Sequence, residues 1–166
     1  MVRTAHPDVR IELRSDPRYV CVARHAIQSM GQVLDLGEKS CAELALAITE
    51  AVSNVIRHGY QGKPDRPIWL SARPVECGGR HGLEVVIEDE CPDVDLARIR
   101  SRSLDDIRPG GLGVHIIQRI MDEVEYEHRE SGNGVRLRIR KYANGTVSNA
   151  GTSGNTSAPA QKEPAL

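Results

Sequence analysis

The stretch ELALAITEAVSNVIRHGY, residues 43–60, decides the fold, because it predicts a helix with two distinct faces. At about 100° per residue, its large aliphatic side chains fall within an arc of about 80° that a core can cover. They are Leu44, Ile48, Val52 and Val55. On the same count, Glu50, Asn54 and Arg57 lie within about 60° on a different arc. The helix, expected over about 38–58, can therefore pack on a sheet and present an acid, an amide and a base to a cleft.

This polar arc has two interpretations. It is an ordinary solvated helix face with a contact between Glu50 and Asn54, or it is part of a site. A carboxylate and an amide oxygen one turn apart suit a hard cation such as Mg²⁺, which takes oxygen ligands and keeps several waters.

Hydrophobic periodicity predicts the remaining elements. Strands are expected over 9–15, 66–76, 82–90, 123–130 and 135–142, and further helices over 18–34 and 111–122. A loop of about 90–111 precedes the last helix and is long enough to suggest a function. The strands meet mostly through short hairpins, so we expect an α+β two-layer sandwich, a mixed, mainly antiparallel sheet with helices on one face.

The last two strands carry complementary charges on one face. Three acids alternate along the first strand and three arginines along the second, namely Glu123, Glu125, Glu127, Arg136, Arg138 and Arg140. Cross-strand pairs of opposite charge help to set the register. An arginine row could bind phosphates, but beside a row of acids it favours a solvated sheet face.

Composition bounds the domain organisation and excludes some function classes. We expect a folded unit over 8–142, a flexible N-terminus over 1–7 and a disordered tail over 143–166, which is rich in Gly, Ser, Thr, Asn and Pro. The chain has 23 acidic and 22 basic residues, so no overall positive field recruits nucleic acid or an anionic membrane. It has no apolar run of the ~20 residues that a membrane span needs and no apolar signal region, so the expected location is cytoplasmic.

The cysteines and histidines predict neither disulfides nor a structural metal. The four cysteines are widely spaced, without a CxxC pair, and are expected to be reduced thiols. The six histidines show no ligand spacing.

A second candidate segment is LEVVIEDECPDVD, residues 83–95. Apolar residues alternate there up to Ile87, and Asp89 is next in the series, so its side chain should face the interior at the end of the strand. A buried acid needs a donor. The exocyclic amine of a purine would serve, and so would the backbone of the following loop.

The third candidate segment, RPGGLGVHIIQRIMDEVEYE, enters a helix through glycines. Gly110, Gly111 and Gly113 leave the N–H groups of the helix N-terminus accessible to an anion, and Arg108 adds a positive charge. Glycines also serve ordinary loop–helix joints, and the pattern is neither a Walker loop nor a Rossmann fingerprint.

Taken in order, these three segments resemble those of the Bergerat-fold (GHKL) ATPases, and most closely the anti-sigma-factor serine kinases of bacterial partner-switching systems. The resemblance covers nearly all of 8–142; EAVSNVIRHGY looks like the family's N box and GGLGVHIIQRIMDEVEY like its second glycine box. It implies ATP and Mg²⁺ as cofactors. Glu50 would be the base for a serine hydroxyl, Asn54 the Mg²⁺ ligand and Asp89 the acceptor for the adenine amine.

The resemblance also implies an ATP lid over 96–111. The nucleotide-binding residues it implies are Asn54, Arg57, Asp89, Cys91, Arg108, Gly110, Gly111, Leu112 and Gly113. One departure stands out: the family usually has glycine at the second position after its aspartate, where this chain has Cys91. Glycine allows the backbone close to the nucleotide, so a cysteine there could weaken ATP binding or displace the loop.

The resemblance implies an ATP-binding anti-sigma factor with serine/threonine protein kinase activity, whose partners are a sigma factor and a STAS-type anti-anti-sigma protein, without direct binding to nucleic acid or membrane. It leaves a homodimer open. The alternative is a regulatory binding module of the same fold that transfers phosphate weakly or not at all. The catalytic half of a sensor histidine kinase fits less well, since residues 1–40 are too few for a dimerisation and phosphoacceptor module.

Overall fold

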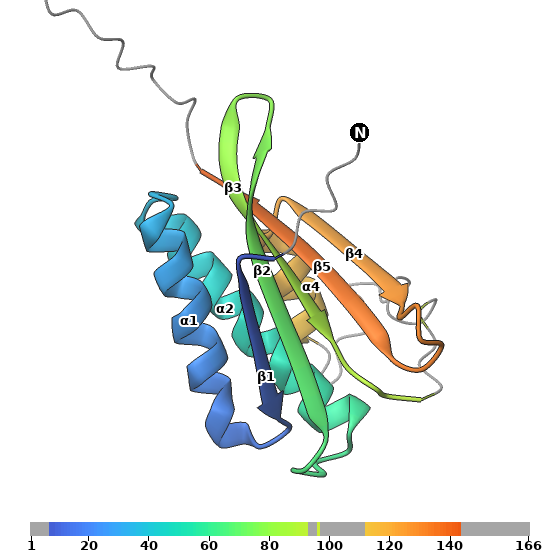
Figure 1. Ribbon diagram of the computed structural model, residues 1–166. Helices are drawn as coiled ribbons and strands as arrows, with labels where there is room; N and C mark the ends of the chain where they lie inside the picture. The colour runs from blue at the N-terminus through green and yellow to red at the C-terminus, as the bar shows by residue number, and fades with distance from the viewer. Residues whose placement is uncertain (1–6, 93–95, 97–111, 144–166) are drawn as a thin grey trace, which may run out of the picture.

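The computed structural model describes residues 7–92, 96 and 112–143. A five-stranded sheet in the order β1-β2-β3-β5-β4 is covered on one face by three helices, as Figure 1 shows. The elements are β1 Val9–Arg14, η1 Pro17–Tyr19, α1 Val20–Val33, α2 Glu38–Asn54, η2 Val55–Gly59, β2 Pro67–Cys77, β3 Arg80–Glu88, α4 Leu112–Ile120, β4 Glu123–His128 and β5 Val135–Tyr142. The predicted α+β two-layer sandwich is confirmed, and all four strand pairings among these residues are antiparallel.

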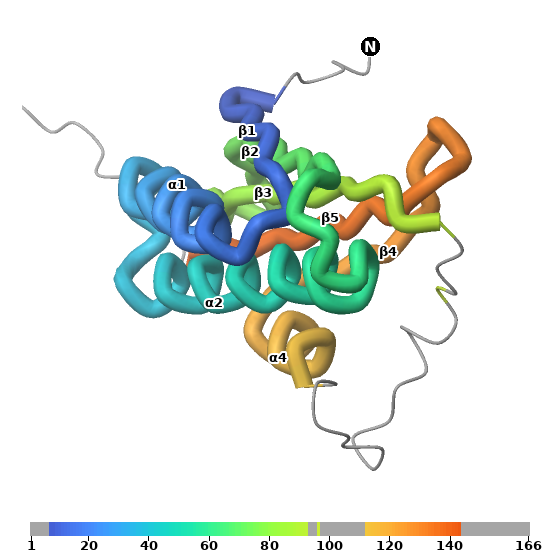
Figure 2. Tube along the Cα trace, turned by 90° about the horizontal axis from the view of Figure 1, so that it is seen from below, coloured from blue at the N-terminus to red at the C-terminus, as the bar shows by residue number. Residues whose placement is uncertain are grey.

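The core lies between the sheet and α2, which runs between α1 and α4 (Figure 2). Leu44, Ile48 and Val52 of α2 are almost wholly buried, as the predicted apolar arc requires. Alternate residues of β2, β3 and β5 face them. These are Ile68, Leu70, Ala72, Leu83, Val85, Ile87, Leu137 and Ile139. Because α2 contacts both neighbouring helices, its polar residues are held in a fixed place beside α4.

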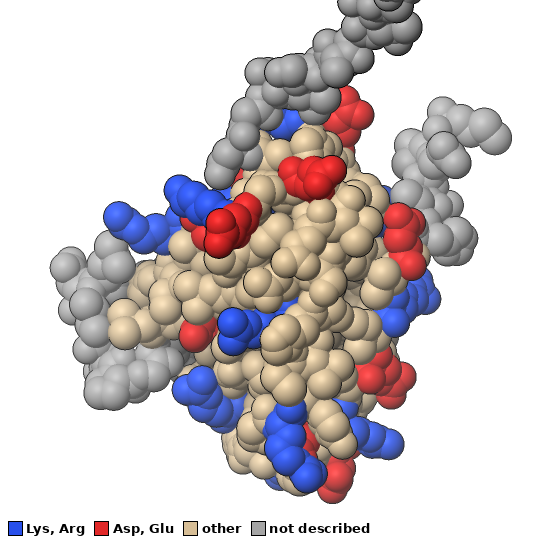
Figure 3. Space-filling view, turned by 90° about the vertical axis from the view of Figure 1, so that its left-hand side faces the viewer, with Lys and Arg blue, Asp and Glu red and all other residues tan. Residues whose placement is uncertain are grey.

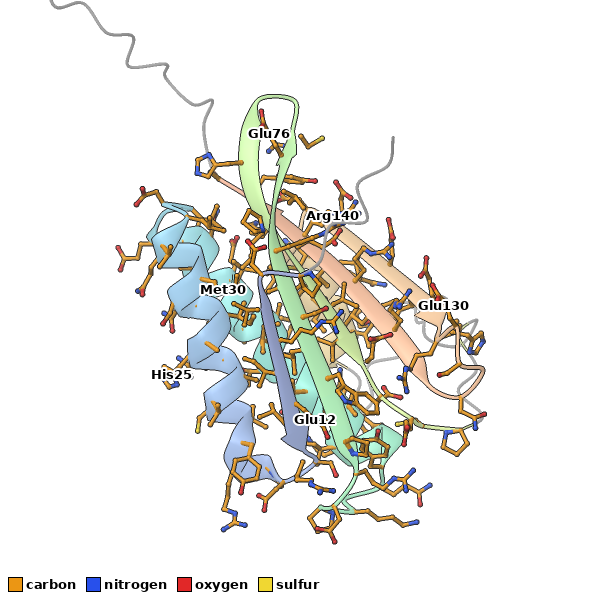
Figure 4. The ribbon with its side chains drawn as sticks, viewed as in Figure 1. Glu12, His25, Met30, Glu76, Glu130 and Arg140 are labelled. Carbon is orange, nitrogen blue, oxygen red and sulfur yellow. The ribbon has the colours of Figure 1, made fainter. Side chains whose placement is uncertain are left out.

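The opposite face of the sheet carries the predicted charge rows. Glu123 lies opposite Arg140, and Glu125 lies opposite Arg138 at an ion-pair distance of 2.7 Å. This face is less solvated than predicted at its centre, because Glu84 is only 4% exposed and accepts hydrogen bonds of 2.7 Å from both Arg73 and Arg140. Burial alone would raise the pKa of Glu84, but these two arginines outweigh it and lower the pKa. Figure 4 shows Arg140 over the sheet.

The helix expected over 38–58 departs from α geometry near its end. The α-helix stops at Asn54, and Val55–Gly59 form a π-helical turn in which the N–H of Tyr60 donates to the carbonyl of Val55 at 2.8 Å. Such wider turns are rare and often lie at functional sites. The periodicity predicted a continuous α-helix, because one extra residue in a turn leaves little trace in the apolar pattern.

Several other expectations from the sequence have an outcome. All four cysteines are free thiols, of which Cys41 and Cys91 are buried. Acidic and basic groups are interspersed on the side of α1, where neither sign dominates (Figure 3). Among the described helices, none combines the length and apolar character needed to cross a bilayer. Of the predicted tail, only Ala143 is described; it is buried, and its N–H donates to the carbonyl of His81.

Candidate functional site

The polar face of α2 meets the first turn of α4 at Glu50 and Asn54. Both side chains are half-buried, and the backbone of Gly113 packs directly against them. A Cβ atom at Gly113 would lie 2.8 Å from Oε2 of Glu50 and 2.9 Å from Nδ2 of Asn54, closer than real Cβ atoms approach. Two of the three candidate segments are therefore in contact, and a residue without a side chain makes that contact possible.

Glu50 and Asn54 make no hydrogen bond or ion pair with any other residue that the structure describes. The contact within the helix that the solvated-face interpretation predicted is therefore absent from this part of the chain. A carboxylate and an amide beside a helix N-terminus, with their oxygens uncommitted, are arranged to hold a cation, an N–H or a hydroxyl.

The N-terminal end of α4, beside Glu50 and Asn54, favours an anion instead of a cation. The described residues of α4 run from Leu112 to Ile120, and the free N–H groups and the dipole of a helix N-terminus favour an anion. Leu112 is half exposed and Gly113 is buried. An anion bound there would lie close to the carboxylate of Glu50, so a cation between the two would relieve their repulsion.

Asp89 lies one residue beyond β3 and is buried, as its place in the alternating series predicted. Its Oδ1 accepts the N–H of Cys91 at 2.8 Å and the N–H of Val135 at 3.2 Å. The loop-capping interpretation is therefore correct for Oδ1. No backbone N–H of the described residues donates to Oδ2, and the other neighbour of this carboxylate is the protonated thiol of Cys91.

Cys91, the departure from the family's glycine, turns its side chain against the end of the π-helical turn. A Cβ atom at Gly59 would lie 2.2 Å from the Cys91 sulfur, so the thiol occupies the space that a side chain at Gly59 would need. Burial, followed by the neighbouring Asp89, raises the pKa of the Cys91 thiol, so it stays protonated. The expected effect of Cys91 on ATP binding or on the following loop stays a prediction.

Tyr60 joins the same helix end to the segment after Asp89. Its hydroxyl donates to the carbonyl of Pro67 at 2.6 Å and accepts the N–H of Glu90 at 2.7 Å. The residue is almost wholly buried, and burial raises its pKa to about 12. The continuous helix α2–η2 thus touches α4 through Glu50 and Asn54, and the Asp89 segment through Gly59 and Tyr60.

Arg57 lies in the π-helical turn that follows Asn54, and its side chain is exposed. A π-helical turn advances by less per residue than an α-helix, so the α-helical count no longer gives the angle between Arg57 and Asn54. Arg57 as a nucleotide contact stays a prediction.

The rest of the predicted phosphate segment lies outside the described residues. Arg108, Gly110 and Gly111 belong to it, as does all of the predicted lid over 96–111 except Leu96. Among the residues that are described, no group of three or more His, Cys, Asp or Glu side chains could hold a metal ion. Water and phosphate oxygens could complete the coordination of a cation at Glu50 and Asn54.

The sequence interpretation missed three residues that shape this site. Tyr60 and Gly59 close the quoted stretch as HGY, an order that predicts only the end of a helix. Gly134 lies in a sequence that indicates only a turn, yet it packs against the backbone of Asp89. The turn sequence SGNG predicts positive φ values but gives no sign of which strand end lies beside it.

Comparisons with known proteins show which family the chain resembles. The family model described as the histidine kinase-like ATPase domain matches residues 13–139. The serine-protein kinase RsbW of Listeria innocua is 26% identical over 149 residues, a match that covers 85% of this chain and 90% of the relative. The protein of the same name from Bacillus subtilis is 26% identical, with 82% and 86% covered.

Two solved structures share the fold. One holds the RsbU and RsbW domains of a Mycobacterium tuberculosis protein; it matches with a TM-score of 0.56 at 15% identity and covers 87% of this chain and 34% of that one. The other is the SiaB–SiaC complex of Pseudomonas aeruginosa, with a TM-score of 0.52 at 14% identity and coverage of 82% and 90%.

Proposed function

The chain belongs to the histidine kinase-like ATPase domain family, and from this premise we propose that it is an ATP-dependent serine/threonine protein kinase that acts as an anti-sigma factor. Its substrate would be a STAS-type anti-anti-sigma protein, and a sigma factor would be its second partner. The relatives named serine-protein kinase RsbW support the kinase activity.

The observation that carries this proposal is the contact of Gly113 with Glu50 and Asn54. It brings a carboxylate, an amide oxygen and a helix N-terminus together within a few ångströms. The N–H groups of the helix suit phosphate oxygens, and the two side chains suit a divalent cation beside them. Phosphoryl transfer depends mainly on positioning and charge neutralisation of this kind.

The residues present fit ATP and Mg²⁺. Asn54 would hold the ion, with water and phosphate oxygens as its other ligands, because no described cluster supplies three side-chain ligands. Oδ2 of Asp89, which receives no backbone N–H from the described residues, would accept the exocyclic amine of adenine. Bound Mg²⁺–ATP supplies the phosphoryl group and an ADP leaving group whose charge the ion neutralises.

Glu50 would act as the general base. In the transfer, the bond between the serine oxygen and the γ-phosphorus forms while the bond between that phosphorus and the ADP oxygen breaks. The hydroxyl proton passes to the Glu50 carboxylate, which has no competing partner among the residues described. Gly113 keeps the space beside that carboxylate free of a side chain.

The proposal is tested by measuring ATP binding and phosphate transfer separately. The wild-type protein, Asp89→Asn and Glu50→Gln are titrated with ATP in the presence of Mg²⁺, and each is incubated with radiolabelled ATP and a candidate STAS protein. Asp89→Asn should lose ATP binding, whereas Glu50→Gln should retain it and lose transfer. Glu38→Gln, an exposed change at the other end of α2, is the control and should lose neither ATP binding nor phosphate transfer.

Two outcomes would contradict the proposal. Unchanged ATP affinity in Asp89→Asn would refute the adenine assignment, and wild-type transfer by Glu50→Gln would refute the base. Nucleotide binding without transfer in the wild-type protein, on any STAS substrate captured from native lysate, would favour the alternative of a non-catalytic, nucleotide-dependent binding module.

A further inference from the structure

We propose that the turn between β4 and β5, residues 129–134, together with the first residue of β5, is a positioning element of the nucleotide site that fixes the carboxylate of Asp89 and so sets the preference for adenine over guanine. This hairpin turn, where Glu130 is labelled in Figure 4, lies next to Asp89 although about 40 residues separate them. The inference rests on the proposed function, because it assumes that Asp89 contacts the base.

The side chain of Asp89 replaces its own carbonyl in the sheet. The β3–β5 register ends at Glu88 opposite Arg136, so the next pair is Asp89 and Val135. The N–H of Asp89 donates to the carbonyl of Val135 at 3.1 Å, as in a regular antiparallel pair. The return bond is different, because the N–H of Val135 donates to Oδ1 of Asp89 at 3.2 Å.

Gly134 makes this exchange possible. The carbonyl of Asp89 is turned toward it, and a Cβ atom at Gly134 would lie 1.9 Å from that oxygen. Gly134 also has a φ of +103°, which favours glycine. Any side chain here would push the carbonyl away and, with it, the carboxylate that has taken its place in the ladder.

Arg129 holds the displaced carbonyl. One of its guanidinium nitrogens donates to the carbonyl of Asp89 at 3.3 Å, and the guanidinium stacks over the ring of Trp69 at 4.5 Å. Glu88 and Glu90 lie at 3.7 and 3.8 Å from the same group. The aromatic face and the two carboxylates leave this guanidinium little freedom, so the carbonyl has a rigid partner.

In the carboxylate of Asp89, Oδ1 therefore accepts hydrogen bonds from the protein backbone, and this fixes the direction in which Oδ2 points. Oδ1 is occupied by the N–H groups of Cys91 and Val135, whereas Oδ2 receives no backbone N–H from the described residues; the protonated Cys91 thiol lies beside the same carboxylate. An amino group on the base would donate to Oδ2, as in adenine, whereas guanine would present a carbonyl oxygen there and be repelled. Discrimination of this sort is strong only when the protein group is held in place.

The test compares two glycine-to-alanine changes in the same turn. Gly134→Ala brings a methyl group against the Asp89 carbonyl, whereas Gly132→Ala, at a φ of +87°, has nothing within 4 Å of its new methyl group. Both strain the turn, so comparing them isolates the contact with Asp89. ATP and GTP binding are measured by calorimetry, and thermal stability is measured without nucleotide.

We expect Gly134→Ala to weaken ATP binding by about tenfold or more and to bring the ATP/GTP affinity ratio close to one. Gly132→Ala should keep the wild-type ratio even where it lowers the melting temperature. Equal ratios in the two variants, with ATP bound normally by the wild-type protein, would overturn the hairpin role alone. Absence of ATP binding in the wild-type protein would overturn the proposed function as well.

A second pair decides the matter if Gly134→Ala does not fold. Arg129→Met removes the donor to the Asp89 carbonyl, and Arg136→Met removes a neighbouring guanidinium that pairs with Glu88 but does not contact Asp89. Arg129→Met should lower the ATP/GTP ratio by about two- to tenfold and Arg136→Met should leave it unchanged. The same ratio in both would refute the proposal.

Discussion

Replacing Gly113 by alanine should separate stability from activity. The new Cβ atom would lie 2.8 Å from Oε2 of Glu50 and 2.9 Å from Nδ2 of Asn54, so both polar groups would have to move by several tenths of an ångström. Both are ends of side chains without a described partner, which makes that movement inexpensive for the fold. Alanine also favours a helix over glycine by up to about 1 kcal/mol, so the free energy of unfolding should stay the same or rise.

The cost should appear in phosphoryl transfer instead. A misplacement of about 1 Å in a reacting group can reduce a rate about a hundredfold, so a shift of several tenths of an ångström predicts a loss of roughly tenfold or more in kcat. The measurements are transfer of labelled phosphate to the STAS substrate at saturating ATP and urea unfolding of the same preparation. A Gly113→Ala protein with the wild-type rate would show that the contact does not position Glu50.

Gly31→Ala is the matched control, because it is also a helical glycine but lies far from the proposed chemistry. Its Cβ atom would lie 3.0 Å from the sulfur of Cys41 in the core between α1 and α2. Overpacking there costs about 1–3 kcal/mol and the helix propensity of alanine returns up to about 1 kcal/mol, so the free energy of unfolding should fall by up to about 2 kcal/mol, with the transfer rate unchanged below the melting temperature. Gly113→Ala should thus lower the transfer rate alone, and Gly31→Ala the free energy of unfolding alone.

Three further predictions concern stability. Gly59→Ala should destabilise the protein by about 1–3 kcal/mol, because its Cβ atom would meet the Cys91 sulfur, and adding Cys91→Gly should restore most of the loss in urea unfolding. Burial raises the pKa of Tyr60 from 10.0 to about 12, so the protonated hydroxyl stabilises the fold fully below pH 10 and this stabilisation is lost as the pH rises toward 12. Tyr60→Phe should therefore reduce the fall in the free energy of unfolding between pH 10 and 12. The same slope in both proteins would contradict the prediction. The pKa of Glu84 is lowered from 4.5, so the stabilisation by its carboxylate is present above that pH and is lost as the pH falls below it. In Glu84→Gln, the free energy of unfolding should therefore decline less steeply with falling pH. Identical declines in the two proteins would show that the ion pairs of Glu84 do not contribute to acid unfolding.

Much of the fold follows from short-range pattern. Alternation along residues 123–142 predicted two strands and the face that carries their charges; the structure then pairs Glu123 with Arg140, and a slip of one residue would turn every charge to the core. The apolar arc of residues 43–60 likewise predicted which side of α2 is buried. These features depend on residues only a few positions apart, which a single sequence displays directly.

The missed features depend on contacts between distant segments. The place of Cys91 against Gly59 joins residues 32 positions apart, and neither residue type signals the other. The exchange of the Asp89 carbonyl for its carboxylate depends on Gly134, whose sequence context indicates only a turn. The π-helical turn escaped because helical periodicity averages over several residues, while the extra residue affects one turn.

That turn also limits how the length of the chain can vary. Deleting one residue between Val55 and Gly59 would let the helix continue in α geometry, and everything after it would rotate by about 100°. The hydroxyl of Tyr60 would then no longer reach Pro67 and Glu90. The turn at Gly78 and Gly79 is exposed, and a side chain added at either glycine would contact nothing within 4 Å. Natural variants should therefore insert or delete residues in this turn and keep the number of residues between Val55 and Gly59 constant.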